Sequence, residues 1–196
     1  RCPDCERTEK LPKQTEKVSM PRPYMFNNAV GIDVNYLSDS DGTTFMLMNM
    51  VDTGTRYQIE AVLREGKGTP SSLQCLDTMM QYWISWGGYP KEVVADRGLN
   101  NRGTFAKELH AAGVYCSNIG LEAPYQLGVT ERHGDIWKHV ASKVIEERQI
   151  EGLTGMTRMA AEVNSIVNEM HRIGGFSPAQ WVIGRQPRGG GEQADE

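Results

Sequence analysis

The stretch that constrains the fold most reads VVADRGLNNRGTF and spans residues 93–105. A short apolar run, Val93–Ala95, ends in Asp96, and a glycine-rich turn follows before the next apolar segment. This pattern predicts a buried strand that ends on a carboxylate. Asp96 then has two interpretations. It is a solvated loop acid, which is the ordinary case, or a metal ligand at the carboxyl end of a strand. Partners elsewhere in the chain must decide between them.

The segments around this stretch predict an α/β fold. Three apolar segments separated by short turns indicate an antiparallel meander, at 28–37, 43–52 and 55–63. Two further strands are expected at 91–96 and 114–119. Apolar residues at helical spacing predict helices from Pro70 to the Gly87–Gly88 pair and at 104–113, 129–148 and 156–172. The order β-β-β-α-β-α-β-α-α describes a mixed five-stranded sheet flanked by helices.

Composition limits the possible functions. The 196 residues suit one domain, and the formal net charge of −4 does not suit a protein that binds nucleic acid by bulk positive charge. Local patches or bound cations would have to supply that charge. No apolar run reaches the roughly 18–20 residues of a membrane span, so we expect no membrane association. The chain begins at Arg1, and we expect it to be part of a longer protein.

The cysteines indicate a compartment rather than a disulfide scaffold. Cys75 and Cys116 lie in apolar segments and are predicted to be buried thiols. Four cysteines in a chain of this size do not make a disulfide framework. We therefore expect a reducing intracellular compartment.

Asp33 is the first potential partner of Asp96. It lies in the apolar segment NAVGIDVNYL, residues 28–37, where an ionised carboxylate is costly unless it is paired or binds a cation. The first strand of a mixed sheet commonly lies in the middle, so a neighbouring strand could bring Asp96 beside Asp33. The simpler alternative is an acid at the edge of the sheet that bonds to a neighbouring group.

Glu131 is the third candidate. It lies nearly opposite the apolar stripe expected on the helix at 129–148, which consists of Val129, Ile136, Val140 and Val144. Lys138, seven residues later, falls on the same face as Glu131. The alternative explanation is an acid in the first turn that the helix dipole favours.

Three clustered carboxylates would repel one another, and at least one pKa would rise in the absence of a cation. A hard divalent ion with oxygen ligands removes that repulsion, and Mg²⁺ prefers a few carboxylates together with water and substrate phosphate. Two such ions roughly 3.5–4 Å apart activate an attacking oxygen and stabilise a leaving one in phosphodiester chemistry. We therefore expect a site for two Mg²⁺ or Mn²⁺ ions.

The blocks that carry these acids resemble those of a known family. GIDV (31–34), VADRG (94–98) and APYQLGVTERHG (123–134) are similar to the Asp, Asp and Glu blocks of the retroviral and LTR-retrotransposon integrase catalytic core. The 34 residues between Asp96 and Glu131 are one fewer than is usual in that family. MVDTGTRY (50–57) and FSPAQWVIGRQPR (176–188) are similar to two further segments of it. The order and spacing of the blocks carry the resemblance.

The resemblance implies an RNase H-like fold and a polynucleotidyl transferase. Asp33, Asp96 and Glu131 would be the catalytic residues and would bind the two metal ions. The implied reaction is cleavage near the 3′ ends of the element's DNA, followed by strand transfer into target DNA. The implied location is the nucleus or a cytoplasmic pre-integration particle.

The same resemblance implies the DNA contacts. Lys138 matches a position that contacts DNA in the family, and the segment from Gly120 to Gly128, which contains Gln126, matches a mobile active-site loop. Arg132, beside Glu131, joins these expected contacts. Asn101, beyond the turn that follows Asp96, could hydrogen-bond phosphate or sugar. Leu127 departs from the family, which usually has an Asn or Gln there, and this puts a polar contact from the loop to DNA in doubt.

The family pattern also predicts a homodimer formed through the core. Three large apolar side chains, Trp83, Trp86 and Trp137, support that expectation weakly, because burial of all three in the core explains them equally well.

Three regions are expected along the chain. Residues 1–27 would be an arm, a remnant of a zinc-binding module, residues 28–188 the catalytic core, and residues 189–196 a disordered tail. Cys2 and Cys5 have the C-x₂-C spacing of half a zinc site. The two histidines of such a module should lie upstream of them, whereas the histidines of this chain belong to predicted core helices, at His110, His133, His139 and His171. We expect no bound zinc.

Two alternatives compete with an active integrase core. One is a decayed or domesticated RNase H-like module that binds nucleic acid or protein without catalysis. The intact set of three acids argues against it, whereas Leu127 and the acidic balance favour it mildly. The other is a different RNase H-like nuclease or transposase. The CPDC arm at 2–5 and the closing segment at 176–188 favour the integrase family instead.

Overall fold

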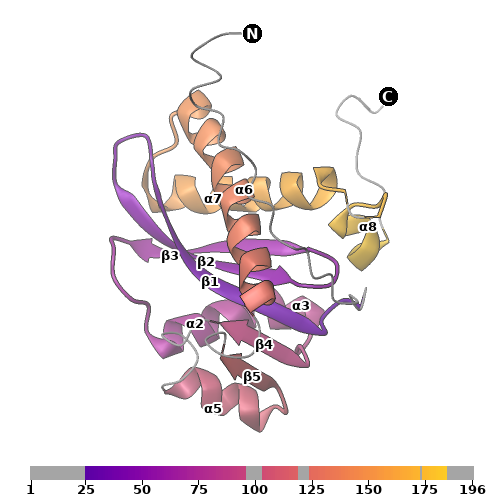
Figure 1. Ribbon diagram of the computed structural model, residues 1–196. Helices are drawn as coiled ribbons and strands as arrows, with labels where there is room; N and C mark the ends of the chain where they lie inside the picture. Colours follow the sequence, from indigo (N-terminus) through magenta and orange to yellow (C-terminus); the bar gives the residue numbers. More distant parts are fainter. Residues whose placement is uncertain (1–24, 96–102, 119–123, 173, 185–196) are drawn as a thin grey trace, which may run out of the picture.

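The computed structural model describes residues 25–95, 103–118, 124–172 and 174–184. These residues contain one five-stranded sheet in the spatial order β3-β2-β1-β4-β5 (Figure 1). β1 is antiparallel to β2 and parallel to β4, so the sheet is mixed, as predicted. The strands are β1 (Ala29–Ser38), β2 (Thr44–Asp52), β3 (Gln58–Glu65), β4 (Glu92–Ala95) and β5 (Tyr115–Asn118).

Helices follow the strands in the predicted order. They are α2 (Ser72–Met79), η1 (Met80–Ile84), α3 (Ser85–Gly87), α5 (Thr104–Ala111), α6 (Pro124–Arg148), α7 (Gly152–Met170) and α8 (Pro178–Ile183). Several details differ from the sequence prediction. α7 begins at Gly152 and not near position 156, and α8 is an additional helix. The segment α2-η1-α3 contains a π-helical turn, and α6 begins five residues before position 129, so Gly128 lies inside the helix. Proline is favoured in the first helical turn, which suits a start at Pro124.

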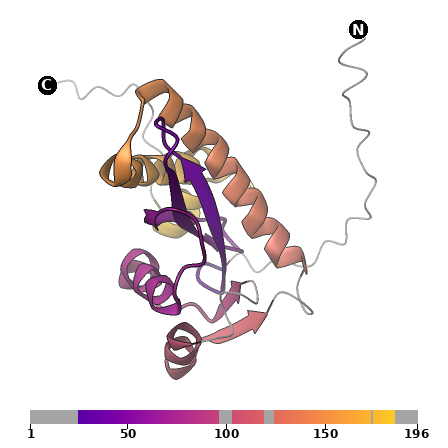
Figure 2. The same cartoon turned by 90° about the vertical axis from the view of Figure 1, so that its left-hand side faces the viewer.

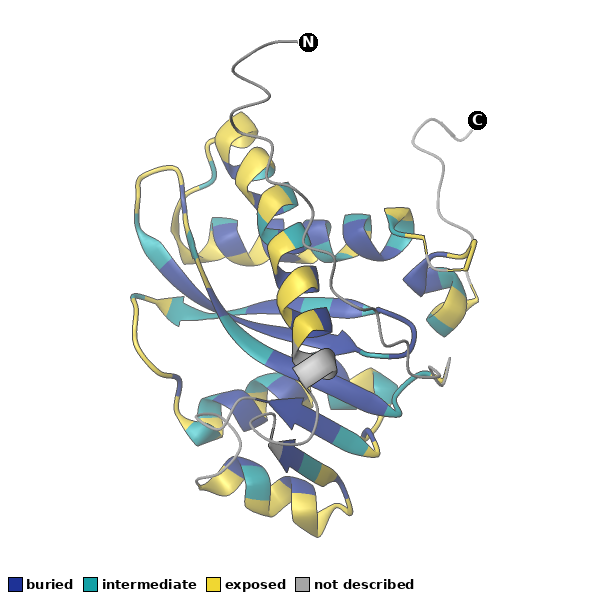
Figure 3. Cartoon of the chain, viewed as in Figure 1, coloured by how far each residue is buried: buried dark blue, intermediate teal, exposed yellow. Residues whose placement is uncertain are grey.

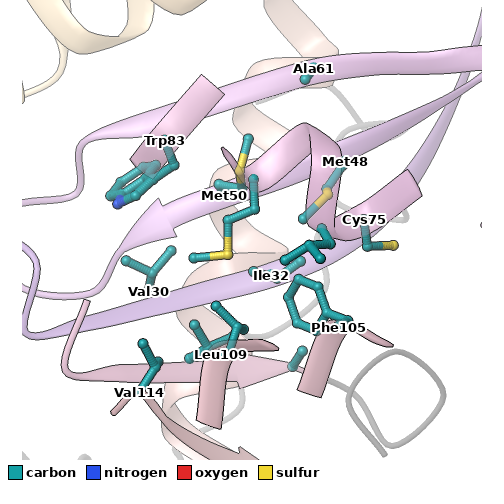
Figure 4. Packing of buried hydrophobic residues seen from close by; sticks show 14 residues of the cluster. Val30, Ile32, Met48, Met50, Ala61, Cys75, Trp83, Phe105, Leu109 and Val114 are labelled. Carbon is teal, nitrogen blue, oxygen red and sulfur yellow. The ribbon is translucent and has the colours of Figure 1, made fainter. Parts of the chain in front are cut away.

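Figure 2 shows the sheet between two helical layers. α2 and α5 cover one face, where the even-numbered side chains of β1, Val30 and Ile32, join the larger apolar core (Figure 4). Side chains of a strand alternate between the two faces. The intervening residues of β1, Gly31, Asp33 and Asn35, are therefore directed to the opposite face, which α6 covers.

The face under α6 is polar along one half and apolar along the other. Phe45 and Leu47 of β2 pack with Trp137 and Ala141 of α6 and with α7 to form a second core cluster. Polar side chains on the same face are also buried, namely Asn35, Asn49, Gln58 and Glu60. α6 therefore lies over a polar region and an apolar region of one sheet face.

The buried stripe of α6 differs from the one that the sequence predicts. Ile136, Val140 and Val144 are only partly buried, whereas Val129 is buried. The side of α6 that faces the sheet carries mostly smaller or polar residues and one tryptophan, namely Thr130, His133, Gly134, Trp137, Ala141 and Ile145. Figure 3 shows α6 exposed along one side and buried along the other. Apolar periodicity missed this stripe because residues that allow close approach to the sheet need not be apolar.

Side chains of α7 form hydrogen bonds with the backbone of the edge strand β3. Asn168 accepts a hydrogen bond from the backbone N–H of Gln58 at 2.8 Å and donates to its carbonyl at 2.6 Å. Asn164, one turn earlier, makes the same pair of bonds with the backbone of Glu60, each at 3.0 Å. Two asparagine amides thus satisfy the edge groups that another strand would otherwise pair with.

The tryptophans divide between core and surface. Trp83 and Trp137 are fully buried, whereas 44% of Trp86 is exposed. Phe26 stacks on both Trp83 and Trp86, and the side chain of Asn27 accepts a hydrogen bond from Trp83 Nε1 at 2.9 Å. Residues just before β1 therefore pack on the α2-η1-α3 segment. None of the helices in the described ranges is long and apolar enough to cross a membrane.

Candidate active site

Asp33 lies on the central strand, next to the end of β4. In the parallel register Ala29 pairs with Glu92 and Ile32 pairs with Ala95, the last described residue of β4. The next residue on β1 is Asp33, which is partly buried, and its Oδ1 accepts a hydrogen bond from the N–H of Val34 at 2.8 Å. Asp96, which follows Ala95 in the sequence, lies outside the described residues.

Two glycines allow α6 to approach this part of the sheet. A Cβ added at Gly31 would lie 2.0 Å from Thr130 Oγ1, so a larger residue at position 31 would clash with the Thr130 side chain of α6. A Cβ at Gly134 would lie 2.8 Å from Asn35 Nδ2 and 3.1 Å from Asn49 Nδ2. The helix that carries Glu131 is therefore in close contact with the strand that carries Asp33.

Buried amides attach α6 to the sheet. Asn49 Nδ2 donates to the Thr130 carbonyl at 3.1 Å. Gln58 Nε2 donates to the His133 carbonyl at 3.2 Å and to Asn49 Oδ1 at 3.0 Å. Buried polar groups that are hydrogen-bonded in this way fix one arrangement of their elements. These hydrogen bonds therefore fix the position and the orientation of α6 relative to the sheet.

Glu131 follows Thr130 and is exposed, as is Arg132. Two turns after Glu131, the half-buried Lys138 forms an ion pair with the exposed Asp135, with 2.9 Å between Nζ and Oδ1. Surface ion pairs of this kind contribute little free energy, so Asp135 does not prevent Lys138 from reaching another anion. Glu131 and Lys138 lie on the same side of α6, as the helical spacing indicates.

Glu60 is a buried carboxyl that the sequence analysis did not select. It lies on β3, is 1% exposed, and its Oε1 accepts a hydrogen bond from Asn35 Nδ2 at 2.7 Å. Burial raises the pKa of Glu60 to about 8, with a smaller raising contribution from the charge of Asp33 and a lowering one from Lys138. The surrounding sequence QIEAVL (58–63) alternates between polar and apolar residues at its start. This pattern is typical of a strand with one exposed face, so it does not predict that Glu60 is buried.

Several expected contacts fall outside what the structure describes. Asn101 is one of them. Cys2 and Cys5, the expected half of a zinc site, also lie outside the described residues. The side chain of Gln126 is also outside the description, although its backbone is helical, which corrects the expectation of a loop up to Gly128. In the described ranges, no group of three or more His, Cys, Asp or Glu side chains could hold a metal ion. The described residues thus contain two of the three expected ligands, Asp33 and Glu131.

The donor set nevertheless suits a hard divalent cation. Carboxylate oxygens are the preferred ligands of Mg²⁺ and Mn²⁺. The charge of Asp33 also acts on its surroundings, because it contributes to the raised pKa of Glu60. Asp33 and Glu131 therefore supply side chains of the type that such a cation prefers.

Comparison with solved structures identifies the fold. The HTLV-2 integrase catalytic core domain in complex with magnesium is similar with a TM-score of 0.66 and 17% sequence identity, over 82% of this chain and 99% of that one. The chain has the fold of a retroviral integrase catalytic core. The BIV integrase core gives a TM-score of 0.63 at 15% identity, over 81% of this chain and 95% of the BIV chain.

A chain of a larger assembly is also similar. The integrase-core fold aligns with a chain of the simian T-cell lymphotropic virus intasome in complex with PP2A regulatory subunit B56 gamma. The TM-score is 0.71 at 16% identity, over 95% of this chain and 64% of that chain. No family model and no curated protein sequence matches the chain. The similarity is therefore one of fold, and it confirms the RNase H-like architecture expected from the sequence.

Proposed function

We propose that this chain is the catalytic core of an LTR-retroelement integrase, which cleaves DNA near the 3′ ends of the element and transfers those ends into target DNA. The observation that carries the proposal is the pairing of Ile32 with Ala95, because an aspartate follows each of them in the sequence. The contact between Thr130 and Gly31 supports it further, since Glu131 follows Thr130 on α6.

In this proposal the chain binds two divalent cations, Mg²⁺ or Mn²⁺, through Asp33, Asp96 and Glu131. When bound, such ions activate the attacking oxygen and stabilise the leaving one. The protein's own contribution is to hold the carboxylates in position. The hydrogen bond from the Val34 N–H holds Asp33. The hydrogen bond from Asn49 to the Thr130 carbonyl holds the part of α6 that carries Glu131.

DNA is the proposed partner. Lys138 and Arg132 on α6 would contact phosphate, and Asn101 and Gln126 would add neutral hydrogen bonds. Because the net charge of the chain is −4, these contacts and the bound cations would have to supply the attraction to DNA. The proposed location is the nucleus or a cytoplasmic pre-integration particle.

The competing function is a module that keeps the fold and binds nucleic acid or protein without catalysis. Leu127 favours it, because the integrase family usually has an Asn or Gln at that position. The two functions differ in their requirement for the carboxylates. A binding module needs none of them for its activity.

A strand-transfer assay with a pre-processed DNA end, Mn²⁺ and the whole chain tests the proposal. Asp96→Asn is nearly isosteric and should lower strand transfer below detection, because losing a metal ligand costs several powers of ten in rate. Asn101→Ala removes one neutral hydrogen bond and should cost at most about tenfold. Equal activity in the parent and Asp96→Asn would contradict the proposed mechanism. An inactive parent would favour the binding module.

We also propose that the chain forms a homodimer through its core. Of the three tryptophans named above, only Trp86 is exposed and could contact a second copy of the chain. Met80 and Tyr89 are exposed on the same segment. Sedimentation velocity at about tens of micromolar should show a dimer in the parent and a larger monomer fraction in Trp86→Ala. A parent that sediments only as a monomer would contradict the dimer.

A further inference from the structure

The carboxyl group of Glu60 is buried beneath α6 with incomplete hydrogen bonding. Its Oε1 accepts a bond from Asn35, whereas Oε2 is buried and has no hydrogen-bond partner in the described structure. A fully buried carboxylate normally has partners for both oxygens, because an unpaired buried charge is costly. An oxygen without a partner is tolerated more easily when the group is a neutral acid.

Glu60 lies in the same cross-strand row as Asp33. Asp33 of β1 pairs with Asn49 of β2, and Asn49 pairs with Glu60 of β3. Neighbouring strands lie about 4.8 Å apart, so the backbones of Asp33 and Glu60 are about 10 Å apart, with the Asn49 side chain between them. A cation bound at Asp33 would therefore act on Glu60 through space, without direct contact.

The polar groups around Glu60 come from three elements. β1 contributes Asp33 and α6 contributes Lys138, and the charges of both act on Glu60. α7 contributes the neutral amide of Asn164, which bonds to the backbone of Glu60. Burial, reinforced by Asp33, raises the pKa of Glu60 to about 8. At neutral pH the protonated form of the Glu60 carboxyl is therefore favoured.

We propose that Glu60 is a positioning residue of the carboxylate site that is protonated when no cation is bound at Asp33 and releases its proton to solvent when a divalent cation binds. The inference rests on the proposed function, because it requires cation binding at Asp33. A divalent charge favours the ionised form of a carboxyl within about 10 Å in the low-dielectric interior. The proton passes to the buffer, and Glu60 then carries one negative charge two strands away from Asp33.

The consequence is a coupling between cation affinity and pH. Below pH 8 the cation must displace a proton from Glu60, so its affinity should rise with pH. Above pH 8 Glu60 is already ionised, and this contribution becomes constant. The charged carboxyl would also attract Lys138, whose charge already lowers the pKa of Glu60. Cation binding would in this way favour a position of Lys138 over the sheet and away from Asp135.

Titration calorimetry of the whole chain with Mn²⁺, in two buffers of different ionisation enthalpy, counts the protons released. For the parent we expect on the order of one proton per chain at pH 7 and close to none from this group at pH 9. Glu60→Gln keeps an acceptor for Asn35 and should release about one proton fewer than the parent at pH 7. The control Glu65→Gln, at the exposed end of the same strand, should match the parent.

The outcomes separate the inference from the proposed function. If Asp33→Asn abolishes Mn²⁺ binding but Glu60→Gln releases as many protons as the parent, the inference is wrong and the proposed function stands. Equal proton release by the parent at pH 7 and pH 9 would overturn the inference without any variant of Glu60. If the parent binds no Mn²⁺, or Asp33→Asn binds it as the parent does, the proposed function fails and the inference fails with it.

Discussion

Ile32 of β1 pairs with Ala95 of β4, and in the sequence each of these two residues precedes an aspartate. Both side chains belong to the apolar core on the α2 and α5 face of the sheet. Because side chains alternate along a strand, Asp33 is directed to the opposite face, under α6. This register is the structural basis for placing the carboxylate site between two strands and one helix.

Divalent cations should stabilise the chain through Asp33. A ligand that binds only the folded state adds RT ln(1 + [L]/Kd), or about 2.7 kcal/mol at a hundredfold excess over Kd. Thermal unfolding with Mn²⁺ should therefore show a higher Tm than unfolding with chelator. Asp33→Asn should lose this shift, whereas Asp41→Asn, in an exposed turn, should keep it. A full Mn²⁺-dependent shift in Asp33→Asn would show that the cation binds elsewhere.

Glu60 should lower the stability of the parent as pH rises from about 4.5 to about 8. Glu60 titrates near 4.5 in the unfolded chain and near 8 in the folded one, so between these values the folded state binds more protons. The free energy of unfolding then decreases with increasing pH. Glu60→Gln lacks this titration and should exceed the parent at pH 8.5 by on the order of 4 kcal/mol. Urea unfolding at pH 5 and pH 8.5 measures the difference, and a difference independent of pH would contradict burial of an ionisable Glu60.

Two glycines of α6 should respond oppositely to alanine. Gly128 has open space around its Cβ position, and Gly128→Ala should stabilise the helix by about 0.5–1 kcal/mol. Gly134→Ala places a Cβ 2.8 Å from Asn35 Nδ2, and overpacking should outweigh the helical gain, with a net loss of about 1–2 kcal/mol. Chemical denaturation measures both changes. Stabilisation by Gly134→Ala would mean that α6 is not held closely against the sheet.

Asn168→Ala should destabilise the fold by about 2–4 kcal/mol. It removes the acceptor and the donor that satisfy the buried backbone of Gln58, and each unsatisfied buried group costs about 1–3 kcal/mol. Ser165→Ala, on the exposed side of the same helix, is the matched control and should stay within about 0.5 kcal/mol of the parent. A similarly small effect of Asn168→Ala would show that water replaces its bonds.

The sheet was predictable because its strands have simple local signals. Apolar runs bounded by Gly, Asp and Asn indicated all five strands, and the position of β1 at the centre followed from topology. The polar half of the α6 face was not predictable. Thr130 and Gly134 contact the sheet because they are small, and apolar periodicity does not register small or polar contacts. Nor could spacing reveal that Glu60 is buried, since its burial depends on α6 and α7, which are distant in the sequence.

The most direct test of the central claim is a crystal structure of the chain grown with Mn²⁺, measured at a wavelength where manganese scatters anomalously. We expect anomalous density about 2.1 Å from carboxylate oxygens of Asp33, Asp96 and Glu131. Anomalous density at another place, or none while Glu131 points away from Asp33, would contradict the assignment of these three residues as the metal site.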